Sequence, residues 1–172
     1  PTIHYVSPSL WAWRGGRIRA MARSVDHVLA LFPFEERLYR DAGIAATYVG
    51  HPLADAIEPG DWTRWGREQL KLPAGRKVFA LLPGSRQSEL RYHAKTFVKT
   101  AQCIAGRFPE AQFLVPLVSR ETRLLFEAAQ YDAQAQDLPI TLLFGHAREA
   151  IAAADAVLVA SASGAGIVGY AS

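Results

Sequence analysis

Cysteine is almost absent from this chain of 172 residues, which limits the chemistry it can carry. The single cysteine, Cys103, excludes an internal disulfide and any cysteine-rich zinc site. The 5 histidines do not pair at ligand spacing with one another or with Cys103, so we expect no metal and no cofactor. We interpret Cys103 as a buried core thiol in a protein from a reducing compartment.

A strong excess of either charge is also missing. The formal net charge is +3 and the isoelectric point is near 9.2. Nucleic-acid binding is not expected, because it usually needs lysines and arginines in one continuous stripe. Glycine and serine interrupt the least polar stretch, residues 150–172, so no membrane span is expected there. The start "PTIHYVSP" has neither an initiator methionine nor a signal-peptide pattern, so we expect a piece of a longer protein.

What the sequence does contain is an alternation of short apolar runs with longer amphipathic segments. Strands are predicted at "IHYV", "HVLALF" and "TYVG", and later at "VFALLP", "QFLVPL", "ITLLF" and "AVLVAS". Helices are predicted over residues 14–23, 35–42, 87–106, 121–130 and 147–153. This alternation is typical of an α/β fold with buried parallel sheets. A polar segment rich in proline and glycine, residues 51–77, predicts a domain boundary near residue 58 and then one lead-in helix.

The most specific local feature is "FALLPGSRQSEL", in which an apolar strand runs directly into a helix. Such a strand end offers free N–H groups and a favourable helix dipole to an anion, so a phosphate is one prediction. Gly84 would let it approach, Ser85 could hydrogen-bond it, and Arg86 would supply a fork of donors. The alternative is an ordinary turn in which Ser85 caps the helix, Glu89 stands near the capping-box position and Arg86 faces solvent. The stretch is neither a P-loop nor a Gly-x-Gly-x-x-Gly fingerprint.

A second strand end supplies further polar and small residues. Gly145 and His146 follow one predicted strand, and Ser161 lies at the end of the next. Two such loops at one sheet edge are what a nucleotide site needs. Taken alone, His146 also fits an ordinary helix start or a surface histidine.

Four segments together resemble the lipid-A-disaccharide synthase family, glycosyltransferases of the two-domain GT-B type. They are "HYVSPSLWAWRGGRI", "LFPFEERLYRDAGIAATYVGHPLAD", "ALLPGSRQSELR" and "AREAIAAADAVLVAS", in the family's order. By this resemblance, residues 1–58 end an N-terminal, acceptor-side Rossmann-like domain. Residues 59–172 would begin a C-terminal Rossmann-like domain that binds the UDP-sugar.

The resemblance also implies a reaction and a set of site residues. The family transfers 2,3-diacylglucosamine from UDP to 2,3-diacylglucosamine 1-phosphate, giving the β-1,6-linked lipid A disaccharide with inversion and releasing UDP. The implied donor site places Gly84, Ser85 and Arg86 near the diphosphate and Gly145 with His146 near the uracil, with Ser161 beside them. Arg86 would stabilise the leaving group. The catalytic base is expected from a portion outside this chain, so the chain alone is expected to be inactive.

The stretch "VSPSLWAWRGGRIRAMAR" carries tryptophans beside arginines, a combination suited to a boundary between water and lipid. Ser7, Trp11, Trp13, Arg14 and Arg17 are therefore expected to face the acylated acceptor or an anionic membrane surface. The alternative is that one tryptophan closes the core while the arginines form a solvated helix face. By analogy with the family, the protein would be cytoplasmic and peripheral to the inner face of the inner membrane of a Gram-negative bacterium.

The tail departs from the family pattern. After "LVAS" the family continues with a Gly-Thr-Ala/Ser-Thr-Leu-Glu run, whereas this chain has "ASGAGIVGYAS", so we expect an incomplete donor pocket. Two other interpretations stay open. One is a nucleotide-binding module without transfer activity, and the other is a different UDP-sugar enzyme of the GT-B type, such as another N-acetylglucosaminyltransferase or an epimerase.

Overall fold

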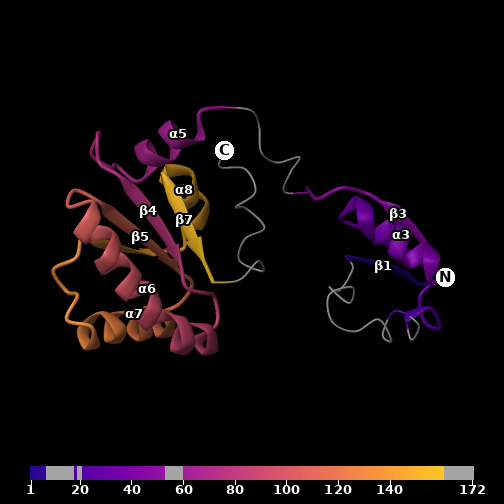
Figure 1. Ribbon diagram of the computed structural model, residues 1–172. Coiled ribbons are helices and arrows are strands. Elements are labelled where there is room, and N and C mark those ends of the chain that lie inside the picture. The colour runs from indigo at the N-terminus through magenta and orange to yellow at the C-terminus, as the bar shows by residue number, and fades with distance from the viewer. Residues whose placement is uncertain (7–17, 19–20, 53–59, 161–172) are drawn as a thin grey trace. The chain divides into compact units, whose positions relative to one another are not determined.

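The computed structural model describes residues 1–6, 18, 21–52 and 60–160. The chain divides into two compact units, Pro1–Glu58 and Pro59–Ser172 (Figure 1). All strand pairs in the described residues are parallel, and helices alternate with the strands along the chain. The predicted fold class, α/β with parallel sheets, is therefore confirmed.

The first unit contains a three-stranded sheet in the order β1-β2-β3. Its elements are β1 (Ile3–Tyr5), β2 (His27–Ala30), α3 (Pro33–Asp41) and β3 (Ala45–Tyr48). Val28 at the centre of the sheet is buried with Tyr39 of α3 and Ile44, which follows that helix. This small core joins α3 to one face of the sheet.

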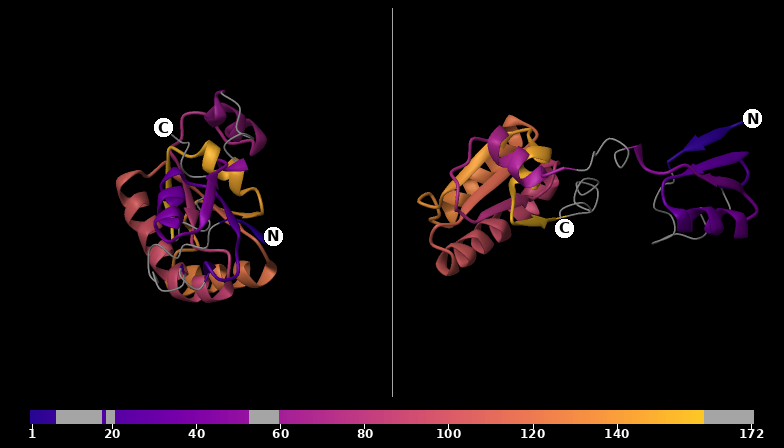
Figure 2. Two further views of the ribbon diagram at one scale, coloured as in Figure 1. Left: turned by 90° about the vertical axis from the view of Figure 1, so that its right-hand side faces the viewer. Right: turned by 90° about the horizontal axis from the view of Figure 1, so that it is seen from above.

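The second unit contains a four-stranded sheet in the order β6-β5-β4-β7, with helices on both faces (Figures 1 and 2). Its strands are β4 (Val78–Leu82), β5 (Gln112–Leu117), β6 (Ile140–Phe144) and β7 (Ala156–Val159). Its helices are α5 (Trp62–Gln69), α6 (Gln87–Arg107), α7 (Arg120–Asp132) and α8 (Ala147–Ala153). α6 and α7 cover one face, and α8 with α5 covers the other.

The side-chain alternation of β4 explains why its sequence is apolar throughout. Leu81 packs into the cluster of α6 and α7, which includes Phe97 and Phe126. Ala80 and its neighbours two residues away pack instead against the cluster that contains Ile151 of α8. Successive side chains of a strand point to opposite faces, so a strand covered on both faces needs apolar residues at every position.

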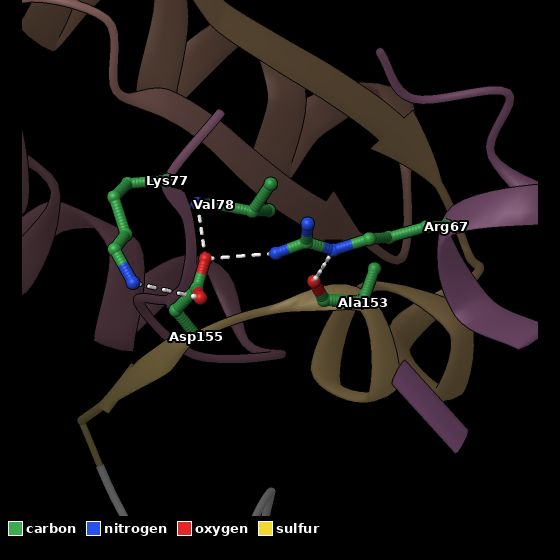
Figure 3. A network of polar contacts seen from close by, with 5 residues as sticks. All are labelled: Arg67, Lys77, Val78, Ala153 and Asp155. Carbon is green, nitrogen blue, oxygen red and sulfur yellow. Dashed lines mark hydrogen bonds and ion pairs between the residues drawn. The ribbon is translucent and has the colours of Figure 1, made fainter. Parts of the chain in front are cut away.

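α5 lies against α8 through a close backbone approach and a polar network. A Cβ atom at Gly66 would lie 2.6 Å from the backbone nitrogen of Ala153, so only glycine permits this packing. The adjacent Arg67 donates to the carbonyl oxygen of Ala153 at 3.1 Å and to Asp155 at 2.9 Å (Figure 3). Asp155 also accepts from the Lys77 ammonium at 3.2 Å. The lead-in helix is thereby joined to the start of β7.

Most element positions predicted from the sequence agree with the structure. The predicted strand 112–117 and helix 147–153 have the same bounds as β5 and α8, while the predicted strand 47–50 is observed two residues earlier, as β3. The predicted helix 14–23 lies largely outside the described residues. Among the residues that the structure describes, no helix is both long and apolar enough to cross a membrane.

The interpretation of Cys103 as a buried core thiol is wrong, because its side chain is exposed on α6. The buried face of this helix follows helical spacing, and its residues are Leu90, Ala94, Phe97, Val98 and Ala101. Position 103 falls between the turns that continue this face, so its thiol points away from the sheet.

Candidate functional site

The strand order places a topological switch point between β4 and β7. From β4 the chain proceeds through α6 to β5 and then β6, and α8 brings it back to β7 on the other side of β4. In open α/β sheets, ligands bind in the crevice outside the carboxyl ends of the strands at such a reversal. The residues that follow β4 and β7 are therefore the first candidates for a site.

The residues that follow β4 are Pro83, Gly84, Ser85 and Arg86, which we call the 83–86 turn. Pro83 is buried, whereas Ser85 and Arg86 are exposed at the sheet edge. Gly84 has φ +132°, a conformation that side-chain-bearing residues rarely adopt. The turn thus presents polar groups to solvent at the switch point, with 74% of the Arg86 side chain exposed.

Glu89, in the first turn of α6, closes the 83–86 turn. One carboxylate oxygen accepts from the backbone N–H of Ser85 at 2.8 Å and from that of Arg86 at 3.1 Å. The other oxygen lies 3.3 Å from the Arg86 guanidinium. The backbone hydrogen bonds from Arg86 and Ser85 lower the pKa of the Glu89 carboxyl, and the Arg86 charge adds to the effect.

These contacts agree in part with the prediction that the 83–86 turn is an ordinary helix cap. Glu89 does make the capping contact, but the N-cap residue is Arg86 rather than Ser85. The reason is spacing, because the N3 side chain of a capping box reaches back three residues, from Glu89 to Arg86. Whether the turn also binds a phosphate stays a prediction.

Gly145 and His146 form the turn after β6. The Gly145 N–H donates to the Leu117 carbonyl at 2.9 Å, which ties this turn to the end of β5. His146 has left-handed backbone angles, φ 56° and ψ 29°, and its Nδ1 lies 3.3 Å from a carboxylate oxygen of Glu149. A left-handed conformation at a residue other than glycine costs on the order of 1–3 kcal/mol. In this chain Lys71 and Gln134, which follow the ends of α5 and α7, also have it.

The sheet brings these two turns to the same edge, separated by the width of β5. Both follow the carboxyl ends of parallel strands, β4 and β6. The other predicted site residues lie outside the described part of the chain, namely Ser161, Ser7, Trp11, Trp13, Arg14 and Arg17. The altered tail from residue 162 onward also lies outside it.

Two features near these turns were not singled out from the sequence. The close seat of Glu89 against Gly84 depends on the φ of that glycine, which no local pattern reveals. Arg148 of α8 lies over the rings of Trp62 and Trp65, with its guanidinium carbon 4.8 Å and 5.5 Å from the two ring centres. This contact joins α8 to α5 by a cation–π interaction between residues more than 80 positions apart in sequence.

Chemically, the described site offers one exposed guanidinium, polar turns at a sheet edge and a histidine beside a carboxylate. Such groups can bind an anion and contact a base or sugar through hydrogen bonds. Within the described ranges, no group of three histidine, cysteine, aspartate or glutamate side chains is placed to hold a metal ion.

Comparison with known proteins gives a consistent result along almost the whole chain. A family model described as lipid-A-disaccharide synthetase matches residues 1–165. The lipid-A-disaccharide synthase of Aromatoleum aromaticum is 59% identical over 161 residues, covering 94% of this chain and 41% of the relative. Those of Dechloromonas aromatica and Methylobacillus flagellatus are 57% and 54% identical, covering 93% and 94% of this chain and 42% and 43% of the relatives. The chain thus spans about two fifths of the length of these curated relatives.

Proposed function

The chain belongs to the lipid-A-disaccharide synthetase family, and from this premise we propose that it is part of a glycosyltransferase of lipid A synthesis. The enzyme transfers 2,3-diacylglucosamine from UDP to 2,3-diacylglucosamine 1-phosphate and forms a β-1,6 linkage with inversion. In this proposal the Pro59–Ser172 unit binds the UDP-sugar and the Pro1–Glu58 unit belongs to the acceptor side. The enzyme works in the cytoplasm at the inner face of the inner membrane.

The observation that carries the proposal for this chain is the position of Arg86. Its exposed guanidinium stands at the carboxyl end of β4, at the switch point where α/β sheets bind ligands. A guanidinium matches phosphate oxygens in charge and in geometry. We therefore place the UDP diphosphate beside Arg86, with Gly84 and Ser85 in the same turn. Gly145 and His146 then face the uracil from the neighbouring part of the edge, and Ser161 follows β7.

The chemical step is a direct displacement at the anomeric carbon. The acceptor 6-hydroxyl oxygen forms the new bond to that carbon while the bond to the UDP oxygen breaks, and the hydroxyl proton passes to a base. One displacement inverts the configuration. Negative charge builds on the departing diphosphate, so a cation at Arg86 lowers the barrier by stabilising that charge. The base comes from a part of the enzyme outside this chain, so the chain alone does not transfer sugar.

The acylated substrates require contact with a lipid surface. We propose that Trp11, Trp13, Arg14 and Arg17, with Ser7, supply it on the acceptor side. Tryptophan rings favour the interfacial zone of a bilayer, and each arginine near an anionic surface contributes about 1 kcal/mol.

A calorimetric titration with UDP tests the donor site. Because the donor pocket is expected to be incomplete, we expect the unaltered chain to bind UDP only weakly. Arg86→Ala should weaken this binding by about 1.5–3 kcal/mol, the value of a charged hydrogen bond. Uridine lacks the diphosphate, so its binding should respond little to Arg86→Ala.

The matched control is Arg123→Ala, which removes another exposed arginine paired with a glutamate, here Glu127 on α7. This variant should bind UDP like the unaltered chain. Equal UDP affinity in Arg86→Ala and the unaltered chain would place the diphosphate elsewhere.

A further inference from the structure

Glu89 occupies the set of donors that the proposed function gives to the diphosphate. Its carboxylate accepts from the backbone N–H groups of Ser85 and Arg86 and contacts the Arg86 guanidinium. No other carboxylate in the described residues contacts these three donors. The 83–86 turn therefore already holds an anion, supplied by the chain itself.

The backbone is shaped to admit this carboxylate. A Cβ atom at Gly84 would lie 2.5 Å from the Cβ of Glu89 and 2.7 Å from one of its carboxylate oxygens. Glu89 thus fills the space that the missing side chain of Gly84 leaves. The Glu89 side chain is 19% exposed, so its carboxylate is still in contact with solvent, from which an anion would approach.

A phosphate cannot share the two backbone N–H groups of Ser85 and Arg86 with Glu89. A backbone N–H makes one good hydrogen bond, and two anions within hydrogen-bonding distance of the same group repel each other. We propose that Glu89 is a displaceable internal anion, which holds the 83–86 turn in place when the donor substrate is absent and withdraws when the diphosphate binds. The proposal rests on the proposed function for the identity of the ligand.

The first unit contains the same kind of glutamate contact in a turn to which we assign no ligand. Glu35, in the first turn of α3, accepts from the backbone N–H groups of Leu31 and Phe32, both at 3.2 Å. Glu35 is buried, and no described lysine or arginine pairs with it. Its carboxylate is therefore a fixed helix cap, whereas that of Glu89 stands beside an exposed arginine at the switch point.

The two roles predict opposite signs for one substitution. In Glu89→Gln, the amide oxygen can still accept from the backbone, but the charge that competes with phosphate is gone. Displacement predicts tighter binding of UDP and of inorganic pyrophosphate, by about tenfold for the loss of one charge-assisted contact. A merely structural cap predicts equal or weaker binding, because loosening the turn cannot improve a site that it organises.

The experiment is a titration of the isotope-labelled chain with UDP and with inorganic pyrophosphate, followed by NMR. Glu35→Gln is the matched control and should leave both affinities unchanged. In the unaltered chain, the amide signals of Ser85 and Arg86 and the carboxyl signal of Glu89 should shift together on addition of pyrophosphate. This measurement needs no variant, so it holds even if Glu89→Gln folds poorly. Equal or weaker binding by a folded Glu89→Gln, or a Glu89 signal that stays still while pyrophosphate binds, overturns the proposal.

The outcomes also separate this inference from the proposed function. UDP binding that depends on Arg86 but is not tightened by Glu89→Gln overturns the role of Glu89 and leaves the donor site standing. Pyrophosphate that displaces Glu89 while UDP does not bind supports the internal anion and contradicts the UDP-sugar assignment. Absence of any shift at Ser85, Arg86 and Glu89 with either probe overturns the role of Glu89.

Discussion

In each unit an aspartate lies just before a strand and makes the same backbone contact with the neighbouring parallel strand. In the first unit, the Asp26 carboxylate accepts from the backbone N–H of Thr2, and the Asp26 N–H donates to the Thr2 carbonyl at 2.9 Å. In the second unit, Asp155 makes the same reciprocal pair with Val78, at 2.8 Å in both directions. The two aspartates stand in equivalent registers, one residue before the first paired residues of β2 and β7.

The difference lies in what else reaches each carboxylate. Asp155 also binds Arg67 and Lys77, and 29% of its side chain is exposed. The side chain of Asp26 is 67% exposed, and in the described residues its ion pair is with the fully exposed terminal ammonium of Pro1, 3.9 Å away. The same local contact is therefore a peripheral hydrogen bond in one unit and the centre of an ion-pair network in the other.

The strand-to-helix turns show the same division. Glu35 and Glu89 each accept from two backbone N–H groups before a helix, so both turns use one local device. Around Glu35 the neighbours are aromatic, with Phe32 and Phe34 stacked 5.7 Å apart, whereas Glu89 has Arg86. The same local contact thus forms both turns, and the two turns differ in the residues around that contact, aromatic rings in the first unit and an exposed arginine in the second.

The largest expected effect on stability comes from replacing the glycine of the 83–86 turn. Gly84→Ala should destabilise the second unit by about 2–4 kcal/mol, since the new Cβ meets Glu89 and the φ of +132° is strained for alanine. Urea unfolding followed by amide exchange in α6 measures this. The first turn has no counterpart to this sensitivity, because the equivalent position is Ala30, which already carries a Cβ atom and lies in β2.

Gly106→Ala is the control for that substitution. Gly106 lies in the last turn of the same helix, and an added Cβ would meet nothing within 4 Å. Alanine there should be neutral or stabilising by up to about 1 kcal/mol. If the two variants have the same stability, Glu89 does not need the space at Gly84.

The next effect separates the two aspartates. Asp155→Ala should cost about 1.5–3 kcal/mol, because it leaves one guanidinium nitrogen of Arg67 and the Val78 N–H without their acceptor. Asp26→Ala removes one exposed hydrogen bond and one exposed ion pair, and should cost about 0.5–1 kcal/mol. Amide exchange in β4 and in β2 reports the two units separately. Equal costs would show that the cations around Asp155 contribute nothing.

The smallest expected effect is a pH dependence of the stability of the second unit, caused by two of its carboxylates, Asp155 and Glu89. Burial raises the pKa of Asp155, but the hydrogen bonds from Val78 and Lys77 and the charges of Arg67 and Lys77 outweigh it, so the pKa is lowered overall. The pKa of Glu89 is lowered as well. A pKa that is lower in the folded state gives stability that is present above the unfolded pKa and is lost as the pH falls through the folded pKa.

Unfolding of the second unit should therefore become easier as the pH falls from about 5 toward 2. The double variant Asp155→Asn with Glu89→Gln should flatten this dependence. The test is urea unfolding at a series of pH values. A slope unchanged by the double variant would mean that other carboxylates carry the acid sensitivity.

Much of the fold could be predicted because each strand and helix carries its own hydrophobic pattern in the sequence. The apolar run of β5 and the amphipathic pattern of α8 define their own ends, and the predicted bounds agree with the structure. The prediction for Cys103 was wrong because a lone cysteine in a long helix says nothing about which face it occupies. Its burial depends on the phase of the whole apolar stripe of α6.

The candidate site was only partly predictable, for a related reason. The sequence marks Arg86 and His146 as residues at strand ends, yet it contains no sign of how far apart the strands lie. The order β6-β5-β4-β7 puts β5 between those two turns and the switch point next to Arg86. That order comes from the path of α8 back across the sheet, which is a property of packing.

The sequence by itself determined the elements, their parallel α/β class and the family, because hydrophobic period, turn residues and segment order are local or linear properties. Only the tertiary structure decided which side chains form hydrogen bonds and ion pairs with one another. It brought Arg67 and Lys77 to Asp155 from 88 and 78 positions away, and it seated the Glu89 carboxylate on the donors beside Arg86. Hydrogen bonds and ion pairs depend on distances of about 3 Å, and such distances are set by folding rather than by order along the chain.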